Sequence, residues 1–171
     1  MRIAVILAAT STLALAACSK EAPAELPPVQ ETQAPVVRPT PTPTPPAGPA
    51  EGSQEHFRMT MAGRDVIYFD TDMSNIDSQD AIALRAQAEY MLQYPRTSAT
   101  VEGHADERGT REYNLALGER RANSAKNYLV SLGVAEGRLR TVSYGEENPA
   151  ATGSNEQAWA RNRRAVTVMI D

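Results

Sequence analysis

The chain has 171 residues, and its 17 Lys and Arg against 21 Asp and Glu give a formal net charge of −4. This length suits about one domain of ordinary size. The negative balance argues against a nucleic-acid-binding protein, because such proteins normally carry a basic face.

Residues 1–17 predict an export signal that is not part of the fold. Met1 and Arg2 form a short basic start, and the mostly apolar run IAVILAATSTLALAA ends in small residues. This run of about 15 residues is shorter than the ~20 that a membrane-spanning helix needs. The pattern is typical of a secretory signal peptide, which is removed from the mature protein.

Cys18 is the only cysteine of the chain and directly follows Leu15, Ala16 and Ala17. A single cysteine in an exported protein has no partner for an internal disulfide. The sequence LAAC resembles the bacterial lipobox, which implies cleavage before Cys18 and acylation of its sulfur and new α-amino group. Two or more acyl chains anchor a protein stably, whereas one gives only reversible binding. Cys18 is followed by Ser19 and not by the aspartate that typically retains such lipoproteins in the inner membrane. We therefore expect the protein to be anchored on the periplasmic face of the outer membrane.

Residues 18–53 predict a tether that begins with the lipidated cysteine. Ten of the twelve prolines lie between positions 19 and 50, and the middle reads RPTPTPTPPAGP. Repeated proline removes backbone donors and favours extended polyproline geometry. At ~3.1 Å per residue, roughly 32 such residues reach about 100 Å when fully stiff. The segment would therefore place a folded unit well away from the lipid.

Residues 54–171 predict a folded domain in which strand-like and helix-like segments alternate. The first strand is expected over the β-branched and aromatic run 65–69 (DVIYF). A helix rich in Ala, Leu, Gln and Glu is expected over 77–94, and Pro95 ends it. The alternating segment 97–103 (TSATVEG) predicts the second strand.

The second half of the domain continues the alternation. A long helix is expected over 111–132 and ends at Gly133, and a third strand follows over 138–145. Ser154 with Gln157 predicts a capping box that opens a short helix through Trp159. The segment 164–170 (RAVTVMI) predicts the last strand. The resulting order, βαβαβαβ, predicts an α/β sandwich with right-handed crossovers between parallel neighbours, without specifying the strand order.

Acidic residues follow the first two predicted strands. Asp70 and Asp72 come after the first strand, and Asp106 comes after the second. Ligand sites of open α/β sheets gather at the carboxyl ends of strands. If the two strands are close in the sheet, Asp72 and Asp106 face one crevice.

Arg121 lies on the apolar stripe of the long predicted helix, between Leu117 and Ala125. An unpaired buried charge is very costly, so we expect a carboxylate nearby, and Asp106 is the predicted partner. Two interpretations stay open. The pair could be a structural ion pair that holds the helix against the sheet. Alternatively, Asp106 could bind the ammonium of a ligand while Arg121 makes a bidentate contact with the ligand's carboxylate. Free N–H groups at the helix start near Thr110 would serve that same carboxylate.

Catalytic and metal chemistry are less well supported by the residue pattern. A zinc site would need two or three His or Cys at ligand spacing, and the chain has only two histidines. The glycines of GHADERG are not followed by the Gly-Lys-Ser/Thr of a phosphate loop, and no serine has an evident His base. A glycoside-cleaving carboxylate pair such as Glu102 with Glu107 stays open on spacing alone. We therefore expect no metal, no cofactor and no catalytic residue.

Four segments resemble the OmpA-like peptidoglycan-binding domain family: VIYFDTDMSNI, VEGHADERGTREYNLALGERRANSAKNYL, VSYGEENPA and NRRAV. The resemblance covers about Gln54 to Asp171, and the lipobox and proline-rich tether fit the same family. It implies a βαβαβαβ sandwich without catalysis that binds diaminopimelate in the peptide stems of murein non-covalently.

The resemblance also implies which residues contact the ligand. Asp106 and Arg121 match the aspartate and arginine that grip the diaminopimelate ammonium and carboxylate. Asp72 matches another ligand-contacting acid, and Thr110 and Leu117 match pocket-lining positions.

Other positions carry further implications of the resemblance. Thr71 stands where the family shows an aromatic residue, which removes the basis for a ring contact to the ligand there. Asn114 is expected to order the loop and not to touch ligand. The family also implies a protein partner, TolB, whose surface overlaps the murein site. Glu102, Glu107 and Tyr113 are candidates for that contact, and each can equally be a solvated surface residue.

The resulting prediction is a lipid-anchored, non-enzymatic protein that links the outer membrane to the cell wall. The resemblance places it in the Tol system, which serves envelope integrity and cell division. Two other functions stay open: an enzyme that hydrolyses murein, and a purely structural protein whose partner is TolB. A hydrolase would degrade purified sacculi, whereas a binding protein would sediment with them and release no fragments. A protein whose sole partner is TolB would not sediment with sacculi.

Overall fold

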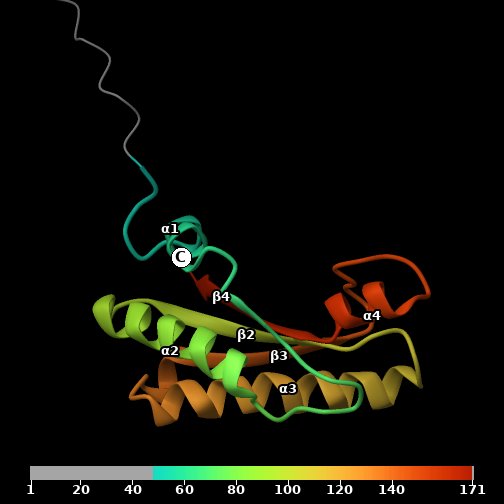
Figure 1. Cartoon of the computed structure of the whole chain (residues 1–171). Helices are drawn as coiled ribbons and strands as arrows, with labels where there is room; N and C mark the ends of the chain where they lie inside the picture. The colour runs from blue at the N-terminus through green and yellow to red at the C-terminus, as the bar shows by residue number, and fades with distance from the viewer. Residues whose placement is uncertain (1–47, 171) are drawn as a thin grey trace, which may run out of the picture. The chain divides into compact units, whose positions relative to one another are not determined.

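A computed structural model describes residues 48–170, and the predicted signal peptide, Cys18 and most of the predicted tether lie outside this range. Figure 1 shows the order of the elements along the chain. They are α1 (Gln54–Met61), β1 (Val66–Tyr68), α2 (Ser78–Gln93), β2 (Ser98–His104), α3 (Arg111–Ser131), the 3₁₀ turn η1 (Glu136–Arg138), β3 (Leu139–Gly145), α4 (Glu156–Asn162) and β4 (Arg164–Ile170).

The four strands form a mixed sheet in the order β1-β4-β2-β3. Strands β2 and β3 are parallel, whereas β4 is antiparallel to both β1 and β2. The carboxyl ends of β1 and β2 therefore meet at one edge of the sheet, with the start of β4 between them. This confirms the predicted α/β class and its strand–helix alternation.

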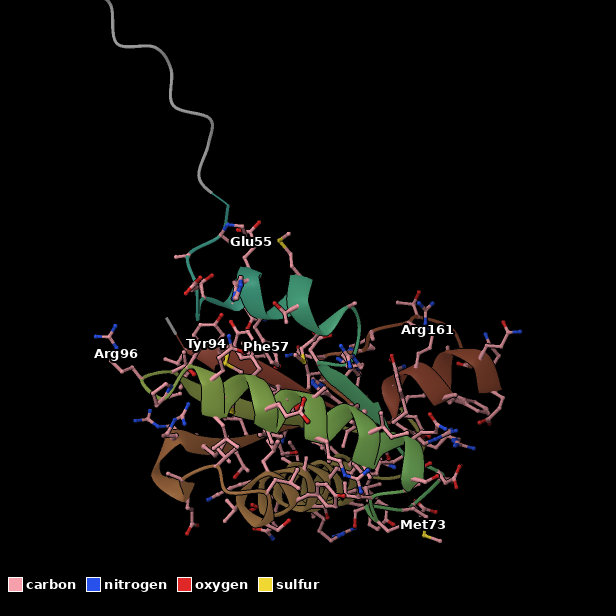
Figure 2. All side chains as sticks on the ribbon, turned by 60° about the vertical axis from the view of Figure 1, so that its left-hand side comes forward. Glu55, Phe57, Met73, Tyr94, Arg96 and Arg161 are labelled. Carbon is pink, nitrogen blue, oxygen red and sulfur yellow. The ribbon has the colours of Figure 1, made fainter. Side chains whose placement is uncertain are left out.

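Helix α1 is an element that the predicted alternation lacks. The Ser53 side chain caps it by accepting the His56 N–H at 3.3 Å. Phe57 and Met61, one turn apart, are buried, and the Phe57 ring lies 5.0 Å from the ring of Tyr90 in α2. Figure 2 shows α1 above α2, with Phe57 between them. Only two buried apolar residues among eight are a weak periodic signal, so tertiary packing decides this helix.

Two boundaries differ from the prediction. Helix α4 is capped by Asn155, whose side chain accepts the Ala158 N–H at 3.0 Å, and not by a Ser154–Gln157 box. Strand β1 covers only three residues, Val66–Tyr68.

In the part of the chain that the structure describes, none of the helices is long and apolar enough to cross a membrane.

Helices α2 and α3 run alongside the sheet, and α1 and α4 lie near opposite ends of β4 (Figure 1). Helix α3 packs closely on β2 because two glycines meet there. A Cβ added to Gly118 would lie 2.8 Å from the carbonyl oxygen of Gly103, closer than real Cβ atoms come. Arg121 follows three residues later on α3, and this close approach brings it to the end of β2.

Candidate functional site

A cavity of about 330 Å³ opens where β1 and β2 end and α3 begins. Four of the five predicted ligand residues line it, so the fold brings together positions that are up to 49 apart in sequence. The lining residues are Thr71, Asp72, Asp106, Arg108, Gly109, Tyr113, Asn114, Leu117 and Arg121.

Asp106 is the central acid of this cavity, and only 9% of its side chain is exposed. Its Oδ1 accepts from the Arg108 backbone N–H at 3.1 Å and from Arg108 Nε at 3.0 Å. Its Oδ2 accepts from Arg108 Nη2 at 2.7 Å and from Arg163 Nη1 at 3.4 Å. Burial works to raise the pKa of Asp106, but these hydrogen bonds outweigh it and lower the pKa below its usual value. The carboxylate is therefore charged at neutral pH.

Arg121 is fully buried, as its place on the apolar stripe predicts. Its predicted pairing with Asp106 is wrong, because its guanidinium donates to three backbone carbonyls. Nε donates to Met73 O at 2.8 Å, Nη1 to His104 O at 2.8 Å and Nη2 to Asp70 O at 3.0 Å. Burial lowers the pKa of Arg121 to about 10, and the charge of Asp106 partly opposes this. Arg121 therefore stays charged at neutral pH and ties the ends of β1 and β2 to α3.

Arg163 is a site residue that the residue pattern did not single out. It lies just before β4, and its side chain is 8% exposed. Besides Asp106, it binds the Phe69 carbonyl through Nε at 3.0 Å and Glu156 Oε1 through Nη2 at 2.8 Å. The segment NRRAV was the available signal, but its arginines had no assigned role. Arg163 holds Asp106 against the end of β1.

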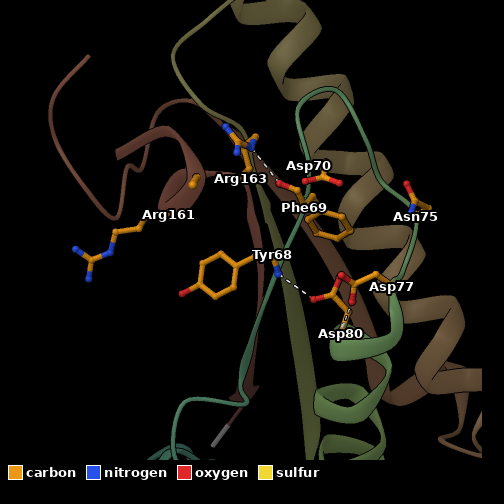
Figure 3. Close-up of a pocket in the computed structure, with 9 residues that line it drawn as sticks. Tyr68, Phe69, Asp70, Asn75, Asp77, Asp80, Arg161 and Arg163 are labelled. Carbon is orange, nitrogen blue, oxygen red and sulfur yellow. Dashed lines mark hydrogen bonds between the residues drawn. The ribbon is translucent and has the colours of Figure 1, made fainter. Parts of the chain in front are cut away.

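A second cavity, of about 360 Å³, lies at the end of β1, and Arg163 belongs to its lining. Figure 3 shows Arg163 beside the Phe69 carbonyl with Asp70 close by, and Asp77 and Asp80 farther along, beside Tyr68. Asp80 Oδ1 accepts the Tyr68 N–H at 3.1 Å, which fastens α2 to β1. The lining of this cavity is Tyr68, Phe69, Asp70, Asn75, Asp77, Asp80, Ala160, Arg161 and Arg163.

Asp72 lies at the mouth of the first cavity in the left-handed region, with φ of 55°. Aspartate is one of the few non-glycine residues that adopt this conformation without large strain. Its Oδ1 accepts the hydroxyl of Tyr113, from the first turn of α3, at 3.2 Å. This contact joins the loop after β1 to α3 across the mouth of the cavity.

Thr110 and Asn114 shape the start of α3. The Thr110 hydroxyl accepts the Tyr113 N–H at 3.2 Å as the N-cap of the helix. Thr110 is exposed and is not among the residues that line the cavity, so its contact with ligand stays a prediction. Asn114 is buried and donates to the Arg108 carbonyl at 3.1 Å. As expected, Asn114 orders this loop.

Two other acids considered from the sequence lie outside the cavity lining. Glu107 accepts from the indole N–H of Trp159 at 3.1 Å, and Glu102 is half-buried on β2. Within residues 48–170, no group of three or more His, Cys, Asp or Glu is arranged to hold a metal ion.

Similar proteins were found by sequence. A profile of the OmpA family matches residues 68–163. Peptidoglycan-associated lipoproteins from Rhizobium meliloti and Mesorhizobium japonicum are each 51% identical over 118 residues, which is 69% of this chain. The match covers 66% of the Rhizobium protein, just under two thirds of its length, and 69% of the Mesorhizobium protein.

Solved structures agree with the sequence matches. The crystal structure of the peptidoglycan-associated lipoprotein from Burkholderia pseudomallei is 41% identical, with a TM-score of 0.60 over 61% of this chain and 89% of that one. The C-terminal domain of Helicobacter pylori MotB shares the fold at 21% identity, with a TM-score of 0.57 over 62% of this chain and 84% of that one. The fold, the residue pattern of the cavity and these matches lead to one assignment: the chain belongs to the OmpA family.

Proposed function

We propose that the cavity lined by Asp106 and Arg121 binds diaminopimelate in the peptide stems of peptidoglycan, non-covalently. The bacterial relatives are named peptidoglycan-associated lipoproteins, which supports a wall ligand for this chain. The single observation that carries the proposal is the presence in one small cavity of a charged, buried aspartate and a charged, buried arginine. Such a pair suits a ligand that carries an ammonium and a carboxylate on one carbon.

The geometry assigns a role to each side of the cavity. Asp106 would accept the ligand ammonium, and Asp72 would add a second negative charge at the mouth. A guanidinium has five N–H donors, and the contacts to carbonyls described above use three of those of Arg121. The remaining two N–H groups of Arg121 would form charge-assisted hydrogen bonds with the ligand carboxylate. Leu117 supplies apolar surface for the methylene chain.

We also propose the cellular context that the sequence predicts. Residues 1–17 would direct export, acyl chains on Cys18 would anchor the chain in the periplasmic face of the outer membrane, and the Pro-rich segment would let the domain reach the wall. The chain would act with TolB in the Tol-Pal system, which supports envelope integrity and cell division. Tyr113 supports an overlapping TolB surface, because it is 43% exposed and stands at the cavity mouth.

A binding protein fits the site better than a murein hydrolase. Peptidoglycan-binding members of the OmpA family are not enzymes, in agreement with the prediction that this chain has no catalytic residue. General acid catalysis by a carboxyl group needs a pKa raised toward the working pH, whereas the pKa of Asp106 is lowered. No turnover of sacculi is therefore expected.

Sedimentation of the protein with purified sacculi tests the proposal. We expect Asp106→Ala and Arg121→Ala each to lower the bound fraction, because each removes one or more hydrogen bonds between charged groups. Such bonds contribute about 1.5–3 kcal/mol each, so affinity should fall roughly tenfold or more. Circular dichroism shows whether each variant remains folded, and Arg121→Lys provides a milder change at the buried position.

Glu119→Ala is the matched control, because Glu119 is an exposed carboxylate on α3 outside the cavity lining. It should sediment like the wild type. If Asp106→Ala and Arg121→Lys stay folded and sediment like the wild type, the assigned cavity is wrong. Release of soluble fragments from the sacculi would instead support the hydrolase.

A further inference from the structure

The oxygen atoms of Asp106 that a ligand ammonium would approach already have donors. An ionised carboxylate offers about four acceptor positions. Four hydrogen bonds reach Asp106: the backbone N–H of Arg108, two from the Arg108 side chain, and one from Arg163. An ammonium can therefore bind Asp106 fully only if one of these donors leaves.

The four donors differ in how readily they can leave. The backbone N–H of Arg108 is part of the loop that Asn114 holds. Arg163 is 8% exposed and is also bound to Phe69 and Glu156. The side chain of Arg108 is 38% exposed. It is the donor that an incoming ligand can displace.

Contacts outside Asp106 hold the Arg108 side chain weakly. Its Nη2 donates to the Thr71 hydroxyl at 3.3 Å, and its guanidinium carbon lies 4.3 Å from the centre of the Trp159 ring. A cation–π contact at an exposed site stabilises the position of the arginine less than a bidentate contact with a carboxylate does. Displacing Arg108 thus costs mainly its contact with Asp106, unless the ligand supplies another carboxylate.

We infer that Arg108 is a specificity-determining residue that competes with ligand amines for Asp106 and selects ligands whose ammonium is accompanied by a carboxylate. A bare amine would displace Arg108 and leave the guanidinium with only the charges of Glu156 and Asp72, neither of which forms a salt bridge with it. The zwitterionic end of an amino acid would displace Arg108 and offer its own carboxylate to the freed guanidinium and to Arg121, which lines the same cavity. The inference rests on the proposed function, since it concerns how the same cavity chooses its ligand.

Three small molecules of matched length separate the two charges. meso-Diaminopimelate carries both groups at each end, 1,5-diaminopentane is the same chain without the carboxylates, and heptanedioate is the same chain without the amines. Each is titrated into the full chain in detergent micelles, and NMR chemical shifts measure affinities down to the millimolar range. The variants are Arg108→Ala and Arg108→Lys.

The decisive measurement is the affinity for 1,5-diaminopentane. Arg108→Ala removes the competing guanidinium, so the affinity for 1,5-diaminopentane should rise about tenfold. The amine then no longer has to break a hydrogen bond between the charged groups of Arg108 and Asp106. The affinity for diaminopimelate should change less, because the variant loses a carboxylate contact as it frees Asp106. The preference for diaminopimelate over the diamine should therefore fall about tenfold. Arg108→Lys keeps a competing positive charge but cannot make the bidentate contact with Asp106. Its preference for diaminopimelate over the diamine should therefore lie between those of the wild type and Arg108→Ala.

Arg111→Ala is the matched control, because Arg111 is an exposed arginine that pairs with Glu147 outside the cavity. It should leave both affinities unchanged. If Arg108→Ala binds the diamine no better than the wild type, including the case in which neither binds it, the inference is wrong even though diaminopimelate binding stands. If wild type does not bind diaminopimelate, or Asp106→Ala binds it equally well, the proposed function fails, and the inference fails with it.

Discussion

His104, the last residue of β2, links the sheet to the site through its backbone, whereas its ring is isolated. Its carbonyl accepts from Arg121, but both ring nitrogens are buried without a hydrogen-bond partner in the described part of the chain. The nearest acid is Glu102, whose Oε2 lies 3.9 Å from Nε2, and the ring stacks on Tyr144. Burial, followed by the charge of Arg164, lowers the pKa of His104 to about 4. The ring is therefore neutral in the folded protein at pH 7.

This residue predicts a loss of stability in mild acid. The unfolded chain binds a proton on His104 near pH 6.5, whereas the folded chain binds it only near the pKa of about 4. The stabilising contribution is therefore complete above pH 6.5 and is lost as the pH falls toward 4, with a total on the order of 3 kcal/mol. Urea denaturation across this range measures it.

His104→Gln is the informative comparison for that measurement, because glutamine does not titrate. Its free energy of unfolding should vary less with pH between 6.5 and 4 than that of the wild type. Equal pH dependence in the two proteins would show that groups other than His104 account for the effect, and the prediction would be wrong.

At the scale of elements, the contact between α3 and β2 decides the geometry of the cavity. Gly103 and Gly118 allow the helix to lie close to the strand. Only at this distance can the guanidinium of Arg121 reach the carbonyl oxygen of His104 and, beyond the sheet end, those of Asp70 and Met73. The packing of two backbones thus places the positive charge of the site.

Gly118→Ala should destabilise the domain by about 1–3 kcal/mol, as added volume in a packed interior does. The new methyl group would meet the Gly103 carbonyl and the Ser143 hydroxyl. Thermal unfolding followed by circular dichroism measures the change. Gly137→Ala is the control, because a Cβ there meets no atom within 4 Å. Equal melting temperatures for the two variants would mean that the helix shifts away from the strand without cost.

At the scale of the whole molecule, the predicted attachment and the proposed binding belong to different parts of the chain. The cavity lies within residues 48–170, whereas the predicted lipid anchor and most of the tether precede this range. A site at the end of a long tether gains from the high local density of stem peptides, since linked binding events raise the effective concentration. Modest affinity at each stem would then suffice for lasting attachment to the wall.

Cys18→Ser should separate these two parts. Without the thiol, acylation cannot occur, so the protein should move from the outer-membrane fraction to the soluble periplasmic fraction in cell fractionation. Binding of the purified variant to sacculi should be unchanged, because the cavity is intact. Intact-mass measurement of the wild type should show an acylated chain that begins at Cys18, and an unmodified thiol there would contradict the predicted anchor.

Much of the architecture follows from the sequence, because strands and helices depend on local patterns. The alternation of residue types predicted the four strands and three of the helices, and the periodicity of α3 placed Arg121 in the interior. The carboxyl-end rule and the family resemblance put Asp72, Asp106, Leu117 and Arg121 at one site, and all four line one cavity. Helix α1 was missed, since its stability comes from packing against α2.

Only the tertiary structure decided which hydrogen-bond partners the charged side chains at the cavity have. The order β1-β4-β2-β3 brings the start of β4, and with it Arg163, between the ends of β1 and β2. Arg121 binds carbonyl groups from distant residues and not Asp106. Every residue carries a carbonyl, so a sequence cannot show which of them an arginine will meet. The sequence by itself identified Asp72, Asp106 and Arg121 as charges of the site. The fold added Arg108 and Arg163 and determined how the charges pair, because pairing depends on contacts between segments that are far apart in the chain.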